Sequence, residues 1–280
     1  MKRFNLFSLL LTCALTCLCP ISFAQTPPGN DQAASASAQL PSKDKFLIVV
    51  LAGQSNMAGR GKVADFDKTP VPRVFMLTRE GQWVPAVEPV HYDKSVAGVG
   101  PGREFARLLA ESNPQIAVGL VPTACGGSPI DSWTPGAYWG QTKSHPYDDA
   151  LARVRRAQED GVLAAILWRQ GEADCSPEKG AEHLEKLKAL FERFRQDFNS
   201  PEVPILVGEL YQYPNPSVGA SLVRQAHIDV TKELPRVAFV SAEGATLNPD
   251  NVHFDRDSQI EQGRRFFQAY QELVAEQPKE

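Results

Sequence analysis

Short runs of apolar residues alternate along the chain with longer segments in which apolar residues recur every three or four positions. The short runs are rich in Val, Ile and Leu without strict polar alternation, which is typical of strands covered on both faces. They predict strands over residues 46–52, 73–77, 116–122, 163–168, 204–210 and 236–241. The amphipathic segments predict helices over residues 102–112, 147–159, 178–198, 218–233 and 257–275.

Strands and helices that alternate in this way predict a three-layer α/β/α sandwich, in which a doubly wound parallel sheet lies between two layers of helices. In such sheets, ligands and reacting groups collect beyond the carboxyl ends of the strands. The polar segments that directly follow the predicted strands are therefore the candidates for a functional site.

The first of these segments, Leu-Ala-Gly-Gln-Ser-Asn-Met-Ala-Gly at residues 51–59, is the most informative. It places Ser55 at the carboxyl end of a predicted strand, where Gly53 and Gly59 let the backbone bend and a substrate approach. A serine in this position is a candidate nucleophile. The alternative is a Ser/Asn turn that caps the next helix.

Two further segments also follow predicted strands. In Thr-Ala-Cys-Gly-Gly-Ser, the paired glycines Gly126 and Gly127 would let a backbone N–H approach a developing oxyanion, although an ordinary turn has the same composition. In Trp-Arg-Gln-Gly-Glu-Ala-Asp-Cys, Gln170 offers a side-chain amide donor, and we interpret Glu172 as an orienting or structural carboxylate. No histidines with metal-ligand spacing lie near Glu172 and Asp174, so we expect no metal.

The fourth segment, Asn-Pro-Asp-Asn-Val-His-Phe at residues 248–254, holds an acid and a histidine three residues apart. Asp250 can hydrogen-bond the Nδ1–H of His253, which leaves Nε2 to take a proton from Ser55. The alternative is a surface histidine beside an acidic turn. The other histidines lack comparable neighbours: His91 and His145 lie in predicted loops, and His183 and His227 lie on predicted helices, where we expect them to be solvated.

In this order, the four segments resemble those of the SGNH-type hydrolases, specifically the branch of sialate O-acetylesterases and carbohydrate esterase family 6, which includes acetylxylan esterases. The resemblance spans residues 45–272. The strings around Ser55 and at residues 170–172 are specific, and Gln170 stands where the usual SGNH hydrolase has Asn. The resemblance implies a mainly five-stranded parallel sheet, in which the strand at 236–241 is marginal or extra, and no metal or organic cofactor.

The resemblance also implies a role for each residue. Ser55 is the expected nucleophile, His253 the general base and then general acid, and Asp250 the carboxylate that orients the imidazole. The expected oxyanion donors are the backbone N–H groups of Ser55 and Gly127, the latter chosen over Gly126, and the amide of Gln170. The expected supporting residues are Gln54, Asn56, Gly126 and Glu172.

The implied activity is serine-dependent removal of acetyl groups from glycans such as acetylxylan, through an acetyl-enzyme intermediate. A sialate O-acetylesterase and a general short-chain esterase are alternatives that the sequence does not separate. A non-catalytic glycan-binding protein on a decayed esterase scaffold is the alternative outside the enzymes. Its candidate sugar-stacking residues are Trp83, Trp133, Tyr138 and Trp139.

Residues 1–24 have a positively charged start, an apolar centre and small residues at positions 22 and 24, as in a secretory signal peptide. We therefore expect export to the periplasm or the medium. A lipoprotein signal is the alternative because Cys17 and Cys19 lie nearby, but neither follows a Leu-small-small sequence. Residues 25–43 are poor in bulky apolar residues and predict a flexible linker, so residues 44–280 form the expected esterase domain.

The net charge of the chain bears on which partners it could bind. Loss of Lys2 and Arg3 with the signal, and of no acid, takes the net charge from −4 to −6. Mild acidity without a basic cluster argues against nucleic-acid binding, and no stretch is long enough for a membrane span.

Of the five cysteines, Cys125 and Cys175 lie outside the signal. In an exported protein they predict a disulfide, with two buried thiols as the alternative.

Overall fold

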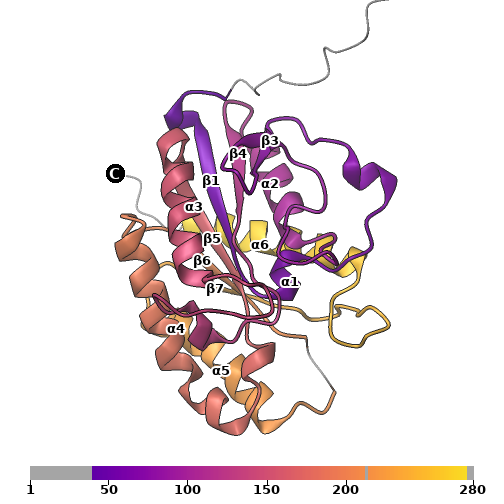
Figure 1. The fold of residues 1–280 in the computed structure, drawn as a ribbon, viewed down its shortest axis with the longest axis vertical. Coiled ribbons are helices and arrows are strands. Elements are labelled where there is room, and N and C mark those ends of the chain that lie inside the picture. Colours follow the sequence, from indigo (N-terminus) through magenta and orange to yellow (C-terminus); the bar gives the residue numbers. More distant parts are fainter. Residues whose placement is uncertain (1–39, 212–213, 276–280) are drawn as a thin grey trace, which may run out of the picture. The chain divides into compact units, whose positions relative to one another are not determined.

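The computed structural model describes residues 40–211 and 214–275 (Figure 1). The predicted signal peptide and most of the predicted linker lie outside these residues, so both stay predictions. The strands are β1 (Phe46–Gly53), β2 (Val74–Leu77), β3 (Trp83–Pro85), β4 (Ala117–Pro122), β5 (Val162–Arg169), β6 (Ile205–Gly208) and β7 (Val237–Val240). The α-helices are α1 (Ser55–Ala58), α2 (Pro101–Ser112), α3 (Pro146–Asp160), α4 (Pro177–Asp197), α5 (Val218–Glu233) and α6 (Arg256–Ala275).

The strands form one sheet in the order β3-β2-β4-β1-β5-β6-β7. All neighbours pair in parallel except β3, which is antiparallel to β2 at the edge. The predicted three-layer sandwich is confirmed, but the sheet has seven strands where the family resemblance implied five. The strand predicted at 236–241 is a full member, since β7 pairs with β6 along its length. The sequence analysis missed β3 because three residues carry no periodic pattern.

The central strand β1 contributes to both hydrophobic cores because successive side chains point to opposite faces of a strand. Phe46, Ile48 and Val50 pack with residues of α3 and α4 on one face. Val49 and Leu51 pack with residues of α2 and α6 on the other. Figure 1 shows these helix layers on either side of the strands. A strand buried on both faces is thus the rigid element from which the candidate nucleophile emerges.

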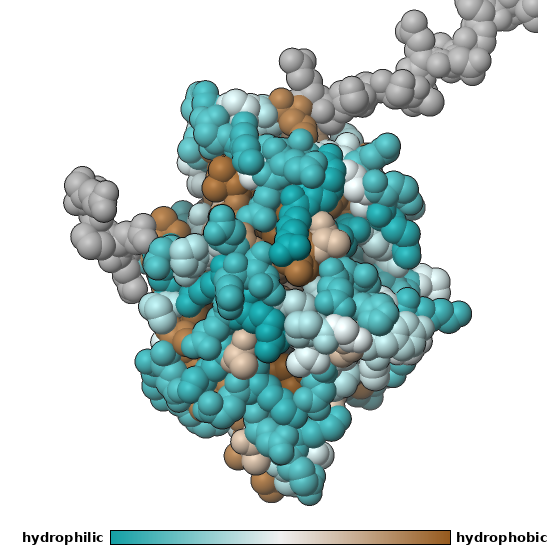
Figure 2. Space-filling model, turned by 60° about the vertical axis from the view of Figure 1, so that its left-hand side comes forward, coloured by the Kyte–Doolittle hydropathy of each residue, from teal (hydrophilic) through white to brown (hydrophobic). Residues whose placement is uncertain are grey.

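The surface shown in Figure 2 is predominantly hydrophilic, and its hydrophobic residues are scattered rather than gathered in one large patch. Within residues 40–211 and 214–275, no helix combines the length and the hydrophobicity that crossing a bilayer requires.

Two histidines expected to be solvated are instead buried between α4 and α5. The Nε2 atoms of His183 and His227 lie 3.3 Å apart, and both side chains are fully buried. Burial lowers the pKa of His183 to about 4 and holds the pKa of His227 well below its usual value. The charged groups around the pair are Asp174, Arg169, Lys186 and Asp131.

Acid should therefore weaken the fold through this pair. The pKa of each imidazole is lower in the folded chain, so the unfolded chain binds protons first and stability is lost as the pH falls toward 4. For His183 alone, the free energy of unfolding should drop by about 2 kcal/mol between pH 7 and 4.5. Urea unfolding across this range measures the loss. The variant His183→Gln should show a shallower pH dependence, and an unchanged slope would contradict this assignment.

Candidate active site

Ser55 begins the short helix α1, and one residue, Gln54, separates it from Gly53 at the end of β1. Gly53 has a φ of 126°, and a Cβ there would lie 2.1 Å from the backbone oxygen of Arg169. Only glycine fits this close contact of β1 with β5. As the first residue of α1, Ser55 has a backbone N–H with no acceptor inside the helix. Its position at the strand end matches the sequence prediction.

The structure brings Ser55, His253 and Asp250 together as one hydrogen-bonded chain. The Oγ atom of Ser55 lies 2.9 Å from Nε2 of His253, and Nδ1 of His253 lies 2.7 Å from Oδ2 of Asp250. His253 and Asp250 come from the loop that precedes α6, and His253 is 198 residues from Ser55 in sequence. This geometry allows the imidazole to accept the serine proton while the carboxylate fixes the orientation of the ring.

The carboxylate of Asp250 is half-exposed, at 49%, and its hydrogen bonds hold it in the ionised form. Its Oδ1 accepts hydrogen bonds from the backbone N–H groups of Val252 and His253, at 2.9 Å each. Desolvation alone would raise the pKa of Asp250, but these bonds and the His253 side chain outweigh it and lower the pKa to about 2. The carboxylate is therefore charged at any pH at which the imidazole could act as a base.

The amide of Asn56 fixes the loop on both sides of His253. Its Oδ1 accepts from the N–H of Phe254 at 3.0 Å, and its Nδ2 donates to the backbone oxygen of Val252 at 3.3 Å. Nδ2 also donates to Oε1 of Glu172 at 2.6 Å. Because Asn56 follows Ser55 in α1, these bonds set the distance between the serine hydroxyl and the imidazole.

The predicted supporting residues Glu172 and Gln54 link the ends of β1 and β5. Glu172 opens a 3-10 helix (Glu172–Asp174) after β5 and holds the Asn56 amide. Oε1 of Gln54 accepts from the N–H groups of Gly171 and Ala173, at 3.2 and 3.4 Å. Both side chains therefore join the two central strands where these strands meet the site.

The turn at residues 125–130 offers one backbone donor. Cys125 N donates to Gly53 O, Gly126 N to Asp93 Oδ2, Ser128 N to Cys125 O and Ile130 N to Asp174 Oδ2, while Pro129 has no N–H. Gly127, with a φ of 79°, is left with an N–H that has no acceptor among the described residues. This pattern favours Gly127 over Gly126 as a free donor, and the role of Gly127 in an oxyanion hole stays a prediction.

Gln170 requires a correction. Its side chain is fully buried, and its Nε2 donates to Ser128 O at 3.1 Å and to Oδ2 of Asp174. An amide nitrogen carries two hydrogens. Both are engaged, so neither is available to an oxyanion in this arrangement. Gln170 instead holds the turn that carries Gly127.

The expected disulfide is also corrected, because Cys125 and Cys175 are both free. The sulfur of Cys125 lies 3.6 Å from the hydroxyl of Ser144, and the sulfur of Cys175 points to Gly171 O at 3.3 Å. Burial raises the pKa of Cys125 to about 11 and that of Cys175 to about 12. Both cysteines are therefore protonated, weakly nucleophilic side chains.

Two of the candidate sugar-stacking residues belong to the core, since Trp83 and Trp133 are buried in the cluster beneath α3 and α4. Tyr138 is exposed, and Trp139 is half-buried and donates through Nε1 to Gly126 O at 3.2 Å. In the described part of the chain, no group of three or more His, Cys, Asp or Glu side chains has a geometry that could hold a metal ion.

A cavity of about 750 Å³ begins beside the loop that carries Asp250 and His253. Val252 and Glu172, which both contact Asn56, form part of its lining. Leu210 and Tyr211 give it an apolar wall, and Arg224 is its cationic residue. Nε of Arg224 donates to Oε1 of the buried Glu209, and the Arg224 side chain is 46% exposed. The sequence analysis did not identify Arg224, because one arginine on a helix carries no functional pattern.

Known proteins are similar to this chain in sequence and in fold. A family model described as carbohydrate esterase, sialic acid-specific acetylesterase, matches residues 45–272. A probable carbohydrate esterase of Arabidopsis thaliana is 31% identical over 264 residues, which cover 87% of this chain and 95% of that protein. A probable 9-O-acetyl-N-acetylneuraminic acid deacetylase of Escherichia coli (strain K12) is 25% identical over 202 residues, covering 56% and 62% of the two chains. An X-ray structure of an Arabidopsis thaliana protein superposes with a TM-score of 0.72 at 30% identity, covering 81% of this chain and 98% of that one.

Loss of the Asn56 hydrogen bonds to Val252 and Phe254 should impair turnover rather than substrate binding. Asn56→Ala should lower kcat for 4-nitrophenyl acetate by about 10- to 100-fold with little change in KM, because a displaced imidazole no longer meets the serine. Glu172→Gln keeps an acceptor for the Asn56 amide and should lose less activity than Glu172→Ala. Steady-state kinetics with melting temperatures test both. Wild-type kcat in a folded Asn56→Ala variant would contradict the role of Asn56 in positioning His253.

Proposed function

Since the chain belongs to the family of carbohydrate esterases described as sialic acid-specific acetylesterases, we propose that it is a serine-dependent O-acetylesterase of acetylated glycans. The observation that carries the proposal is the hydrogen-bonded chain from Ser55 through His253 to Asp250. It supplies a nucleophile, a base and an orienting carboxylate in a single connected arrangement.

In the proposed reaction, Oγ of Ser55 attacks the carbonyl carbon of an acetyl ester while Nε2 of His253 takes the hydroxyl proton. The carbonyl oxygen becomes an oxyanion, which the N–H groups of Ser55 and Gly127 stabilise. Collapse of this intermediate expels the sugar oxygen, protonated by His253, and leaves an acetyl-enzyme. Water, deprotonated by His253, then attacks the acetyl-enzyme, and acetate leaves as Ser55 regains its proton.

The cavity beside Val252 and Glu172 supports a sugar as the alcohol part of the ester. Its volume of about 750 Å³ lies within the range of roughly 300 to 1,000 Å³ that is usual for ligand sites. Apolar residues and hydrogen-bonding groups such as Asn215, Ser217 and Gln225 line it together, as suits a sugar ring. An acetyl group alone is far too small to account for this space.

Acetylxylan and O-acetylated sialic acid are the two candidate substrates, and one observation favours the second. Arg224 lines the cavity with a half-exposed side chain, of which Nε pairs with Glu209, and a guanidinium binds a carboxylate well. Xylose carries no carboxylate, whereas sialic acid does. The Escherichia coli relative is described as a probable deacetylase of 9-O-acetyl-N-acetylneuraminic acid, in keeping with this preference.

We also propose that the protein is exported to the periplasm or the medium, on the pattern of residues 1–24. This location suits an enzyme of extracellular glycans. Determination of the mature amino terminus tests the proposal, with cleavage after Ala24 as the expected result and an uncleaved chain as the contrary one.

Acetate release from acetylxylan, O-acetylated sialic acid and 4-nitrophenyl acetate tests the activity. Ser55→Ala should lower the rate by about a thousandfold or more on every substrate, because the nucleophile is lost. A folded Ser55→Ala variant that keeps wild-type turnover would contradict the serine mechanism. No release by the wild type from any of the three would contradict the proposed function.

The same assay separates the two substrates through Arg224. Arg224→Gln should lower kcat/KM for O-acetylated sialic acid by about tenfold, since one charge-assisted contact is removed. Acetylxylan and 4-nitrophenyl acetate should be unaffected, as should every substrate with the exposed control Arg155→Gln. An equal loss on all three substrates would show that Arg224 acts on the fold rather than on the sugar.

A further inference from the structure

Two buried carboxylates hold the turn at residues 125–130 from its two sides. Asp93 accepts the N–H of Gly126 at 2.9 Å, and Asp174 accepts the N–H of Ile130 at 2.9 Å. We propose that Asp93 and Asp174 are positioning residues of the oxyanion hole, which together keep the N–H of Gly127 directed at the reacting carbonyl. The inference rests on the proposed function, because it concerns how that reaction's donor is held.

Gly127 needs such support because nothing in its own structure fixes it. It has no side chain, and its φ of 79° is one that glycine leaves easily for other conformations. A preorganised donor is useful only when it already points to the place where charge develops. A fixed donor between Gly126 and Ser128 therefore requires partners outside the turn.

Asp93 connects the turn to the helix of the nucleophile. Its side chain is 3% exposed and pairs with Nη2 of Arg60 at 2.8 Å. Nη1 of Arg60 donates to the backbone oxygen of Gly59 at 2.7 Å, and Gly59 directly follows α1, which begins with Ser55. Asp93 and Arg60 thus link the two backbone segments that supply the proposed oxyanion donors.

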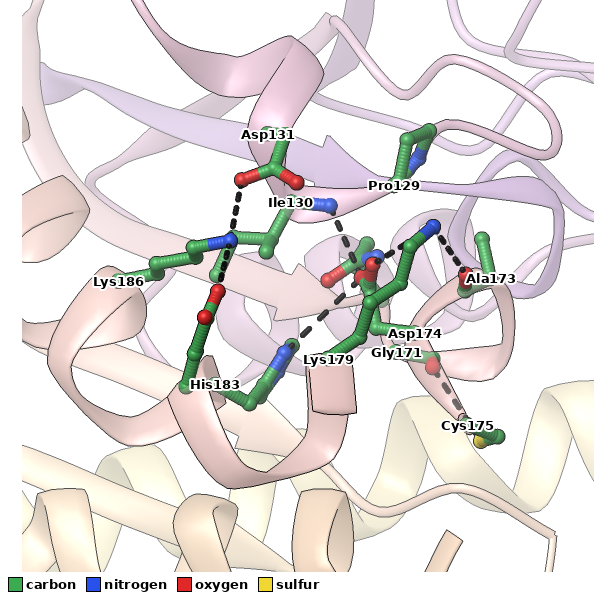
Figure 3. Close-up of polar contacts among 12 residues, drawn as sticks. Pro129, Ile130, Asp131, Gly171, Ala173, Asp174, Cys175, Lys179, His183 and Lys186 are labelled. Atoms are coloured by element: carbon green, nitrogen blue, oxygen red, sulfur yellow. Dashed lines mark hydrogen bonds and ion pairs between the residues drawn. The ribbon is translucent and has the colours of Figure 1, made fainter. Parts of the chain in front are cut away.

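Asp174 connects the other end of the turn to β5. Its side chain is 1% exposed, and its Oδ2 accepts both the N–H of Ile130 and the Nε2–H of Gln170, which also donates to Ser128. Figure 3 shows the carboxylate between Ile130 and the side chains of Lys179 and His183. These two side chains lie 4.0 and 3.9 Å from it, too far for hydrogen bonds.

The environment of Asp174 is unfavourable for a carboxylate that serves stability alone. Burial raises its pKa, and its Oδ1 has no hydrogen-bond partner among the described residues. An apolar or neutral residue would avoid the desolvation cost of a buried charge. In exchange for this desolvation cost, the carboxylate of Asp174 accepts hydrogen bonds from Ile130 and Gln170.

The test compares Asp93→Ala, Asp174→Ala and Asp174→Asn with Asp131→Asn. Asp131 is a matched control, because it follows Ile130 but pairs with Lys186 at 2.6 Å and lies on the exposed side. Each alanine variant should lower kcat by about 10- to 100-fold with KM within about threefold, less than the loss of a donor outright. Asp174→Asn keeps an acceptor oxygen and should lose less, which preserves the test if Asp174→Ala does not fold.

A trifluoromethyl ketone provides the readout that a merely structural role would not move. It adds to Ser55 as a tetrahedral oxyanion, so its inhibition constant should rise by the same factor by which kcat/KM falls in each variant. The inhibition constant of free sialic acid, the deacetylated product, which forms no oxyanion, should stay within about twofold of the wild type.

Two results would overturn the proposal. If the folded aspartate variants turn over acetyl ester as Asp131→Asn does, or if sugar and ketone inhibition weaken equally, the carboxylates do not position the donor. In both cases the wild type remains active and the proposed function stands. A wild type that neither releases acetate nor binds the ketone would instead overturn the function and this inference together.

Discussion

The amide of Asn56 is the contact on which the geometry of the site depends. Ser55 and His253 are 198 residues apart in sequence, and the sheet brings their segments only into the same neighbourhood. Asn56 follows the serine, and its side chain accepts from Phe254 and donates to Val252, on either side of the histidine. A side chain of the serine's own helix therefore holds both neighbours of His253 and helps to set the hydrogen bond between Ser55 and His253.

The buried guanidinium of Arg169 carries a desolvation cost, and its position next to the site explains why a charged residue lies there. Arg169 is fully buried, its guanidinium lies 4.5 Å from the centre of the Phe254 ring, and burial lowers its pKa to about 10. The nearby carboxylates of Glu172 and Glu209 offset part of this desolvation. This charged group packs against Phe254, the residue after His253, and so contacts the loop that carries the proposed base. An apolar residue would pack there at less cost but would not attract Glu172, which holds Asn56.

Much of this architecture could be predicted from the sequence, because the information is local. Apolar runs located six of the seven strands, and amphipathic periodicity located the five long helices. The polar segment after β1 pointed to Ser55, and an acid and a histidine three residues apart pointed to Asp250 and His253. The failures share a physical cause. The direction of the Gln170 amide, the separation of Cys125 from Cys175 and the burial of His183 all depend on distances between segments, which local patterns do not encode. Asp93 was missed for the same reason, since it lies in an irregular segment with no neighbouring motif.

Two separate hydrogen-bond networks fix the loop of His253 and the turn of Gly127, and both connect to the same pair of strands. Asn56 and Glu172 hold the loop of His253, whereas Asp93 and Asp174 hold the turn of Gly127. Each network connects to β1 or β5, directly or through the residues that follow it, and these two strands pair in the middle of the sheet. The proposed base and the proposed oxyanion donor are consequently positioned against the same rigid pair of strands. The segments around them can then vary in sequence and shape to suit a substrate without moving the reacting groups relative to one another.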